Sequence, residues 1–201
     1  MNAVADALID GLRQRYSEPQ RRYHTQAHID ALLRWAETLR VDIADDEAVH
    51  WAIWYHDAIY DPQAKDNEER SAQLAEVELG HAGLPAEKVA HIAAMVRATA
   101  HHMATDAQGD MALFLDMDLS ILGITPEYYE RYVQQVRAEY AWVSDAQFAQ
   151  GRAQLVAQWL DEPVLFKTDY FQQRLESQAR SNLSAELVKL RKIIDLMLLN
   201  K

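Results

Sequence analysis

Apolar residues recur at a helical spacing of three or four positions along almost the whole chain. Before His56, for example, Val49, Ala52, Ile53 and His56 lie at positions i, i+3, i+4 and i+7, so they share one face of a helix. No segment sustains the alternation of apolar and polar residues that a half-buried strand requires. Gly and Pro, which interrupt helices, number only six and five. The sequence therefore predicts an all-α fold.

Residues that favour helix ends divide this pattern into segments. Asp45 or Asp46 suits the start of the helix that runs to Asp57, and Asp66 with Glu69 three positions later predicts a capping box at the next helix. The helices after residue 125 are expected to form an appended hairpin. The expected helices cover residues 2–16, 46–57, 66–80, 85–100, 111–122, 126–140, 148–159 and 169–199. A further helix carries the apolar residues of 29–36 and begins by residue 24 if the histidines before it share its face.

Length and composition set limits on the kind of protein. At 201 residues, the chain suits one domain, or one domain with an appended helical hairpin, and its core is stable without disulfides or metals. With no cysteine, disulfides and thiolate zinc sites are excluded, which fits a reducing cytosol. The start of the chain lacks basic residues and a long apolar core, so we expect a soluble, cytoplasmic protein without a membrane partner.

The net charge of −11 disfavours a surface that binds nucleic-acid polymers or anionic lipid. It does not exclude a small anionic substrate, because a local arginine or metal can outweigh the overall sign. Three arginines, Arg137, Arg152 and Arg180, could bind substrate phosphate. We favour ion pairs between helices for them. Within the last expected helix, Glu176 also lies four positions before Arg180, which predicts an i, i+4 pair.

His56 and Asp57 end the apolar helix in an unusual way. An imidazole on the buried face needs partners for both ring nitrogens, and burying the neighbouring carboxylate without compensation is costly. A bound cation would satisfy both side chains. The alternative is a helix end whose polar residues simply emerge at the surface.

His24 and His28 form a second pair. They are four positions apart and in line with Leu32, so both point the same way if the helix begins by His24. The alternative is a surface helix start, with Thr25 as the cap and both imidazoles in solvent.

Two carboxylates complete the set of candidates. Asp118 lies on the apolar stripe of its segment, while Asp116 lies on the opposite side of that helix and stays open as an alternative ligand. Glu68 falls on the apolar stripe of residues 66–80, although a role in complementing the helix dipole is as well supported. We expect His81 and His91 in solvent and His101 at a helix dipole, and leave His102 undecided.

Together, His28, His56, Asp57 and Asp118 place two imidazoles and two carboxylates on inward faces of three apolar helices. Borderline divalent ions, such as Mn, Co, Ni, Fe or Zn, accept mixed nitrogen and oxygen ligands, and Mg is a further candidate. Four protein ligands leave positions open for water and substrate on a six-coordinate ion, which favours catalysis over a structural role.

These residues resemble the HD superfamily of metal-dependent phosphohydrolases, which is named for the pattern His…His-Asp…Asp. The resemblance covers about residues 20–125 and is carried by YHTQAH at 23–28, WYHDAIYDP at 54–62 and DLSILG at 118–123. A group of HD proteins of similar length, described as predicted phosphohydrolases, also shares DNEERSA at 66–72 and ARSNLSAEL at 179–187. The resemblance implies a single HD-type helical bundle over residues 1–201, with a metal-binding core at about 20–125 and C-terminal helices at about 126–201.

The resemblance also implies roles for single residues. Cyclic-nucleotide phosphodiesterases, distant members of the superfamily, carry a Tyr-His-Asn-x-x-His element, which implies that His24 is the acid for the leaving group and His28 a metal ligand. Here Thr25 replaces the Asn, and the glycine-rich continuation and the substrate-clamping C-terminal region are missing, which puts cyclic nucleotides in doubt as substrates. The His-Asp-x-x-Glu-Asp pattern of guanosine-tetraphosphate hydrolases is also absent, so Glu68 is the candidate for acid–base work.

The expected function is hydrolysis of a phosphate ester of a small molecule, a nucleotide being one option, by metal-bound water. One rival is a di-iron HD oxygenase, which needs two further histidines between His56-Asp57 and Asp118. A second rival is a non-catalytic module that senses a nucleotide. A homo-oligomer is compatible with the sequence, which does not decide the oligomeric state.

Overall fold

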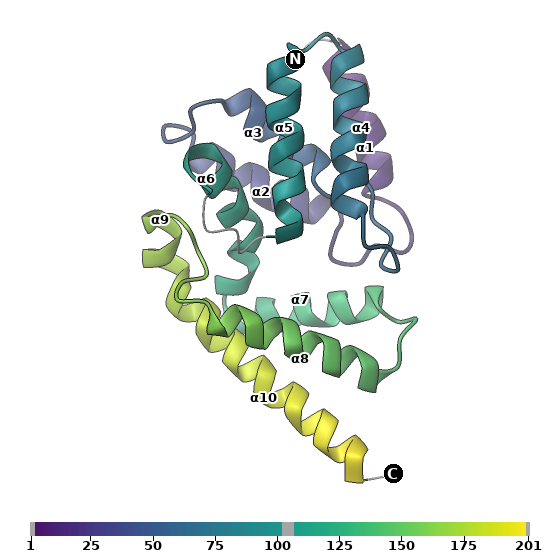
Figure 1. The fold of residues 1–201 in the computed structure, drawn as a ribbon, viewed down its shortest axis with the longest axis vertical. Coiled ribbons are helices and arrows are strands. Elements are labelled where there is room, and N and C mark those ends of the chain that lie inside the picture. The colour runs from purple at the N-terminus through teal and green to yellow at the C-terminus, as the bar shows by residue number, and fades with distance from the viewer. Residues whose placement is uncertain (1–2, 102–106, 200–201) are drawn as a thin grey trace. The chain divides into compact units, whose positions relative to one another are not determined.

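The computed structural model describes residues 3–101 and 107–199, and every regular element in these ranges is helical (Figure 1). This confirms the all-α prediction. The α-helices are α1 (Ala3–Arg15), α2 (Gln26–Thr38), α3 (Asp46–Tyr55), α4 (Asn67–His81), α5 (Ala86–Ala98), α6 (Gly109–Leu119), α7 (Pro126–Glu139), α8 (Asp145–Asp161), α9 (Asp169–Phe171) and α10 (Ser177–Leu199). Short 3₁₀ turns cover Thr99–His101 and Ser120–Gly123, and Gln172–Glu176 forms a π-helical turn.

The chain divides into two compact units, residues 1–118 and 119–201. In the first unit, α1, α2, α4 and α5 all contact α3. Nearly every residue of α3 from Ala48 to Tyr55 is buried, as expected for a central helix that is hydrophobic all round. His56, the residue directly after α3, therefore lies in the interior of this unit.

Hydrogen bonds to carboxylates hold the start of α3. The Asp45 side chain accepts a hydrogen bond from the backbone N–H of Ala48 at 3.1 Å, so Asp45 rather than Asp46 is the N-cap. The backbone N–H groups of Ala44 and Asp45 in turn donate to the two carboxylate oxygens of Asp110, each at 2.8 Å. Because Asp110 lies in the first turn of α6, these bonds attach α6 to α3.

The predicted capping box at α4 is wrong. Asp66 occupies the N-cap position, but its side chain makes no cap hydrogen bond. Glu69 instead accepts two hydrogen bonds from the Arg97 guanidinium of α5, at 2.7 and 2.9 Å. A bidentate bond to a charged donor is stronger than a bond to a backbone N–H, so the tertiary contact wins over the local one.

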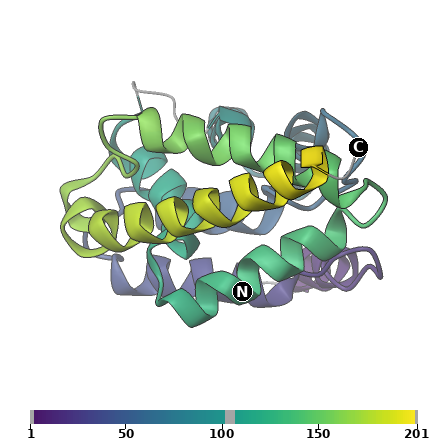
Figure 2. The ribbon, with the colours of Figure 1, turned by 90° about the horizontal axis from the view of Figure 1, so that it is seen from below.

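In the second unit, α8 and α10 pack along each other, as the green and yellow helices of Figure 2 show. Arg152 of α8 donates to Glu186 of α10 at 2.8 and 3.2 Å, and both side chains are buried. Arg180 pairs with Glu176 at 2.7 Å, and Arg137 pairs with Asp145 at 2.6 Å. Arg152 and Arg137 thus have ion pairs between helices, as we favoured over phosphate binding. The ion pair of Arg180 lies within one helical stretch, and its guanidinium reaches the end of α8 through the carbonyl oxygens of Leu160 and Glu162.

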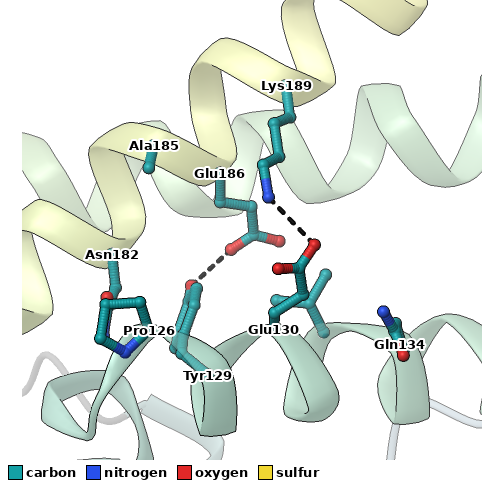
Figure 3. Close-up of a pocket in the computed structure, with 9 residues that line it drawn as sticks. Pro126, Tyr129, Glu130, Gln134, Asn182, Ala185, Glu186 and Lys189 are labelled. Carbon is teal, nitrogen blue, oxygen red and sulfur yellow. Dashed lines mark hydrogen bonds and ion pairs between the residues drawn. The ribbon is translucent and has the colours of Figure 1, made fainter.

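A small cavity of about 150 Å³ lies between α7 and α10 (Figure 3). Four of the polar side chains that line it form two pairs: the Tyr129 hydroxyl donates to Glu186 at 2.5 Å, and Lys189 donates to Glu130 at 3.1 Å. These polar groups are therefore satisfied within the protein, and the cavity's remaining surface is mainly apolar.

The last predicted helix differs from the structure. The sequence predicts an unbroken α-helix over residues 169–199, but the π-helical turn Gln172–Glu176 interrupts the α-helical geometry. The Glu176 carboxylate accepts hydrogen bonds from the backbone N–H groups of Leu165 and Phe166 and from Arg180. A π-helical turn at this point places Glu176 where it can serve all three donors.

Across the described residues, no helix combines the length and apolarity needed to cross a bilayer.

Candidate metal centre

His28 lies in the first turn of α2 and is buried together with Ile29, Leu32 and Ala36 of the same helix. The structure starts α2 at Gln26, so the premise that the helix begins by His24 is wrong. Thr25 takes the N-cap position with an extended backbone, but its side chain makes no cap hydrogen bond. Of the two histidines, only His28 is therefore placed by the helical pattern.

His56 directly follows α3 and is 1% exposed. Its Nδ1 lies 2.8 Å from the carbonyl oxygen of Ile53. A carbonyl only accepts, so Nδ1 carries the proton in this hydrogen bond, and the neutral ring has its lone pair on Nε2. This is the arrangement in which a histidine binds a metal through Nε2.

Four ligand atoms converge next to this ring. The Nε2 atoms of His28 and His56 are 3.1 Å apart. Oδ1 of Asp118 lies 3.1 Å from Nε2 of His28 and 3.6 Å from Nε2 of His56. Oδ2 of Asp57 lies 3.1 Å from Nε2 of His56 and 3.7 Å from Nε2 of His28. The ligand atoms of His28, His56 and Asp118 all lie within 4.8 Å of one another.

These spacings fit a metal ion. For ligands about 2.1 Å from an ion, neighbouring donors are roughly 3.0 Å apart in an octahedron and roughly 3.4 Å apart in a tetrahedron. The four distances from a carboxylate oxygen to a ring nitrogen, 3.1 to 3.7 Å, and the 3.1 Å between the two nitrogens are close to these values. His28, His56 and Asp118 form the group that could hold a metal ion, and Asp57, which is not part of that group, adds a carboxylate oxygen near both imidazoles. A mixed set of nitrogen and oxygen donors suits a borderline divalent ion.

The electrostatics of the cluster also favour positive charge. Burial alone would lower the pKa of His56, but the carboxylates of Asp57 and Asp118 outweigh burial and raise it to about 9. Burial likewise acts to raise the pKa of Asp57, but positive charge on the neighbouring histidines, His56 first, holds it below its usual value. The buried cluster therefore attracts a cation, whether a proton or a metal ion.

The two sides of the cluster differ in exposure. The side chains of His28 and His56 are 4% and 1% exposed, whereas those of Asp57 and Asp118 are 17% and 12% exposed. The imidazoles thus close the inner side, and the carboxylates reach the surface. This exposure would give a small molecule access to an ion held by these residues.

Two residues that the sequence did not single out hold the chain around His56. The Tyr16 hydroxyl, at the end of α1, donates to the carbonyl oxygen of Trp54 at 2.9 Å. Ser71 of α4 is fully buried, and its hydroxyl oxygen accepts a hydrogen bond from the Ile59 N–H at 3.0 Å. The first bond satisfies a carbonyl that the end of α3 leaves without a helical partner, and the second satisfies a backbone N–H in the segment that follows α3.

His24 lies beside the cluster, although it precedes α2. Its ring is 6.2 Å from the ring of His28, between centroids, and it stacks on Tyr60 at 4.2 Å. The side chain is half-buried. Positive charge on His24 is one of the causes of the lowered pKa of Asp57, which is a further sign of proximity.

The remaining candidates are less closely connected with the cluster. Asp118 supplies a carboxylate to it, while Asp116 is completely buried and not one of the converging ligands. Glu68 lies half-buried in the first turn of α4, and within the described residues no hydrogen bond or ion pair joins it to the cluster. His81, His91 and His101 are exposed, and His102 lies outside the described residues.

The chain matches no family model, no curated protein and no solved structure. Over the described residues the chain is all-helical, and its buried group of His28, His56 and Asp118 could hold a metal ion.

Proposed function

We propose that the protein is a metal-dependent phosphohydrolase of the HD type, which hydrolyses a phosphate ester of a small molecule, a nucleotide being one candidate. The observation that carries the proposal is the convergence of His28, His56, Asp57 and Asp118, with carboxylates that reach the surface. These residues occur along the chain in the order His…His-Asp…Asp, which the superfamily is named for.

His28, His56, Asp57 and Asp118 are the residues that would hold the ion, which we expect to be Mn, Mg, Co, Ni, Fe or Zn. When bound, such an ion supplies Lewis acidity, which neutralises phosphoryl charge and acidifies water. The residues themselves orient it: the hydrogen bond from His56 Nδ1 to the Ile53 carbonyl keeps Nε2 directed at the site. Four protein ligands also leave coordination positions for substrate on a six-coordinate ion.

We assign to His24 the transfer of a proton to the leaving-group oxygen of the substrate. It lies next to His28 without being one of the converging ligands, and its stacking on Tyr60 fixes the ring. Positioned proton transfer of this kind accelerates a reaction by about 10² to 10⁴. Glu68 stays a second candidate for acid–base work, with less support because no described contact joins it to the cluster.

The proposal is tested by elemental analysis of the purified protein, followed by assays of nucleotides, sugar phosphates and cyclic diesters with each divalent metal in turn. One metal per chain and turnover of a phosphate ester are expected. Two irons per chain with oxygen consumption would favour a di-iron oxygenase instead, although His81, His91 and His101 are exposed rather than turned into the site. Nucleotide binding without turnover would favour a sensing module.

A further inference from the structure

Arg21 lies between α1 and α2, and its side chain is 0% exposed. Each nitrogen of the guanidinium donates a hydrogen bond to an acceptor within the protein. Nη1 donates to the carbonyl oxygens of Asp57 at 2.8 Å and His24 at 3.1 Å, and Nη2 donates to that of Ala58 at 3.1 Å. Nε donates to the Glu18 carboxylate at 3.2 Å. A buried arginine with three backbone acceptors is unusual, because arginine is rarely buried and then usually pairs with carboxylates.

The acceptors come from the two segments that build the metal centre. One segment, with His24, leads into α2 and places His28. The other segment, after α3, carries His56 and Asp57. Nη1 of Arg21 bonds to both segments at once, although 36 positions separate Arg21 from Asp57. A planar guanidinium presents its donors in a fixed fork, so it sets the spacing between its acceptors.

Aromatic rings hold the guanidinium in turn. Its central carbon lies 5.0 Å from the ring centroid of Tyr16 and 5.4 Å from that of Tyr60. Tyr60 is also the ring on which His24 stacks, at 4.2 Å. Arg21 therefore touches the backbone of His24 directly and its side chain through Tyr60.

Arg21 is not placed to bind substrate. Its side chain has no exposed surface, and its donor groups are occupied by Glu18 and the three carbonyls. Its connection to the site runs through the backbone of the residues that carry the chemistry.

We propose that Arg21 is a positioning residue, which holds His24 in register with the metal ligands His56 and Asp57. This inference rests on the proposed function for the part that concerns His24. The inference that Arg21 positions His56 and Asp57 rests only on its hydrogen bonds to the carbonyl oxygens of Asp57 and Ala58, in the turn after α3.

The test replaces Arg21 by Lys, which keeps the positive charge and loses the planar fork. Manganese affinity, measured by calorimetry and by the electron paramagnetic resonance signal of unbound Mn²⁺, is expected to fall at least tenfold. The matched control is Glu18→Gln, which removes the ion pair of Arg21 and leaves its three backbone acceptors in place. It is expected to change the affinity less than twofold.

A second measurement separates positioning from simple loss of folded protein. The hydrolysis of an alkyl phosphate, which has a poor leaving group, is compared with that of an activated aryl phosphate. Arg21→Lys is expected to lower kcat for the alkyl ester at least tenfold more than for the aryl ester, since only the alkyl ester needs the acid. Loss of folded protein would lower both rates by the same factor.

The outcomes are distinct. Unchanged manganese affinity and an unchanged rate ratio in Arg21→Lys would overturn the inference and leave the proposed function intact. A variant that does not fold, judged by circular dichroism at low temperature, would also overturn it, because the role of Arg21 would then be to stabilise the fold. Absence of metal binding by the unaltered protein would instead refute the proposed function.

Discussion

Nδ1 of His56 donates a hydrogen bond to the carbonyl oxygen of Ile53, three residues earlier in the chain, at 2.8 Å. This bond uses a carbonyl at the end of α3 that would otherwise need another partner. It also decides the direction of the opposite nitrogen, since Nε2 then faces Nε2 of His28 at 3.1 Å. The end of one helix thus orients a ligand by satisfying its own backbone.

His56→Ala is expected to remove bound metal and turnover together. The change deletes a ligand and takes from the carboxylate of Asp57 its nearest imidazole and from that of Asp118 one of its two imidazole neighbours, so the remaining carboxylates repel one another. Metal per chain is measured by elemental analysis after gel filtration, and a fall from about one to near zero is expected for a site that needs every ligand. Asp57→Ala is expected to behave in the same way.

The matched control for these variants is His91→Ala, because His91 is exposed on α5. It is expected to keep both metal and turnover. Full turnover in His56→Ala, with this control also active, would show that the reaction occurs elsewhere.

His24→Ala is expected to keep the metal and to lose rate. His24 is near the cluster but outside the converging ligands, so its removal leaves the donor set intact. The loss on substrates with poor leaving groups is expected to be about 10² to 10⁴ in kcat, the usual range for a positioned acid. Steady-state kinetics on alkyl and aryl phosphates check this, and an equal loss on both would contradict the acid role.

His28, His56 and Asp118 could be predicted because helical register points them inward, whereas Asp57 was proposed as the neighbour of His56. His56 continues the face of Val49 and Ile53, and Asp118 continues the face of Phe114, so an inward direction follows from spacing. Arg21 could not be predicted in this way. Its acceptors are backbone carbonyls, which carry no sequence signal, and they lie on a segment far along the chain. It also stands beside Arg22, which is exposed, and nothing in the sequence distinguishes the buried arginine from the exposed one.

Partners that lie far along the chain also explain why the capping box predicted at α4 does not form. Glu69 has the spacing of a capping box, but a guanidinium from α5 competes for its carboxylate. Local patterns are reliable where no distant side chain offers a better partner. The capping box at α4 failed for that reason, whereas the cap at Asp45 formed as predicted and the predictions of helical faces depended only on burial.

With His50→Phe, the free energy of unfolding is expected to fall less between neutral and acid pH than it does in the unaltered protein. His50 is half-buried on α3, and among the described residues its Nε2 is buried without a hydrogen-bond partner. Burial lowers its pKa, while Asp46 and Glu47 act in the opposite direction and do not cancel the effect. The unfolded chain, with a pKa of about 6.5, therefore takes up a proton more readily than the folded one.

The sign of the pH dependence follows from linkage. The contribution of His50 to stability is fully present above about pH 6.5 and is lost as the pH falls through the lower folded pKa. Urea unfolding of both proteins at pH 7.5 and pH 5, in the presence of a chelator, measures the difference. The variant is expected to lose less free energy of unfolding between the two pH values, and equal losses would exclude a contribution from His50.

Gly123→Ala is expected to destabilise the second unit by about 1 to 3 kcal/mol, the usual cost of overpacking. A Cβ added to Gly123 would lie 2.5 Å from Cβ of Leu175 and 2.9 Å from its carbonyl oxygen. The backbone of Leu175 belongs to the π-helical turn before α10, so it cannot move as a flexible side chain would. Gly151→Ala is the matched control: it lies within α8 with no atom within 4 Å of its added Cβ, and it is expected to stabilise by roughly 0.5 to 1 kcal/mol. Chemical unfolding followed by circular dichroism measures both changes, and a neutral Gly123→Ala would show that this close approach relaxes without cost.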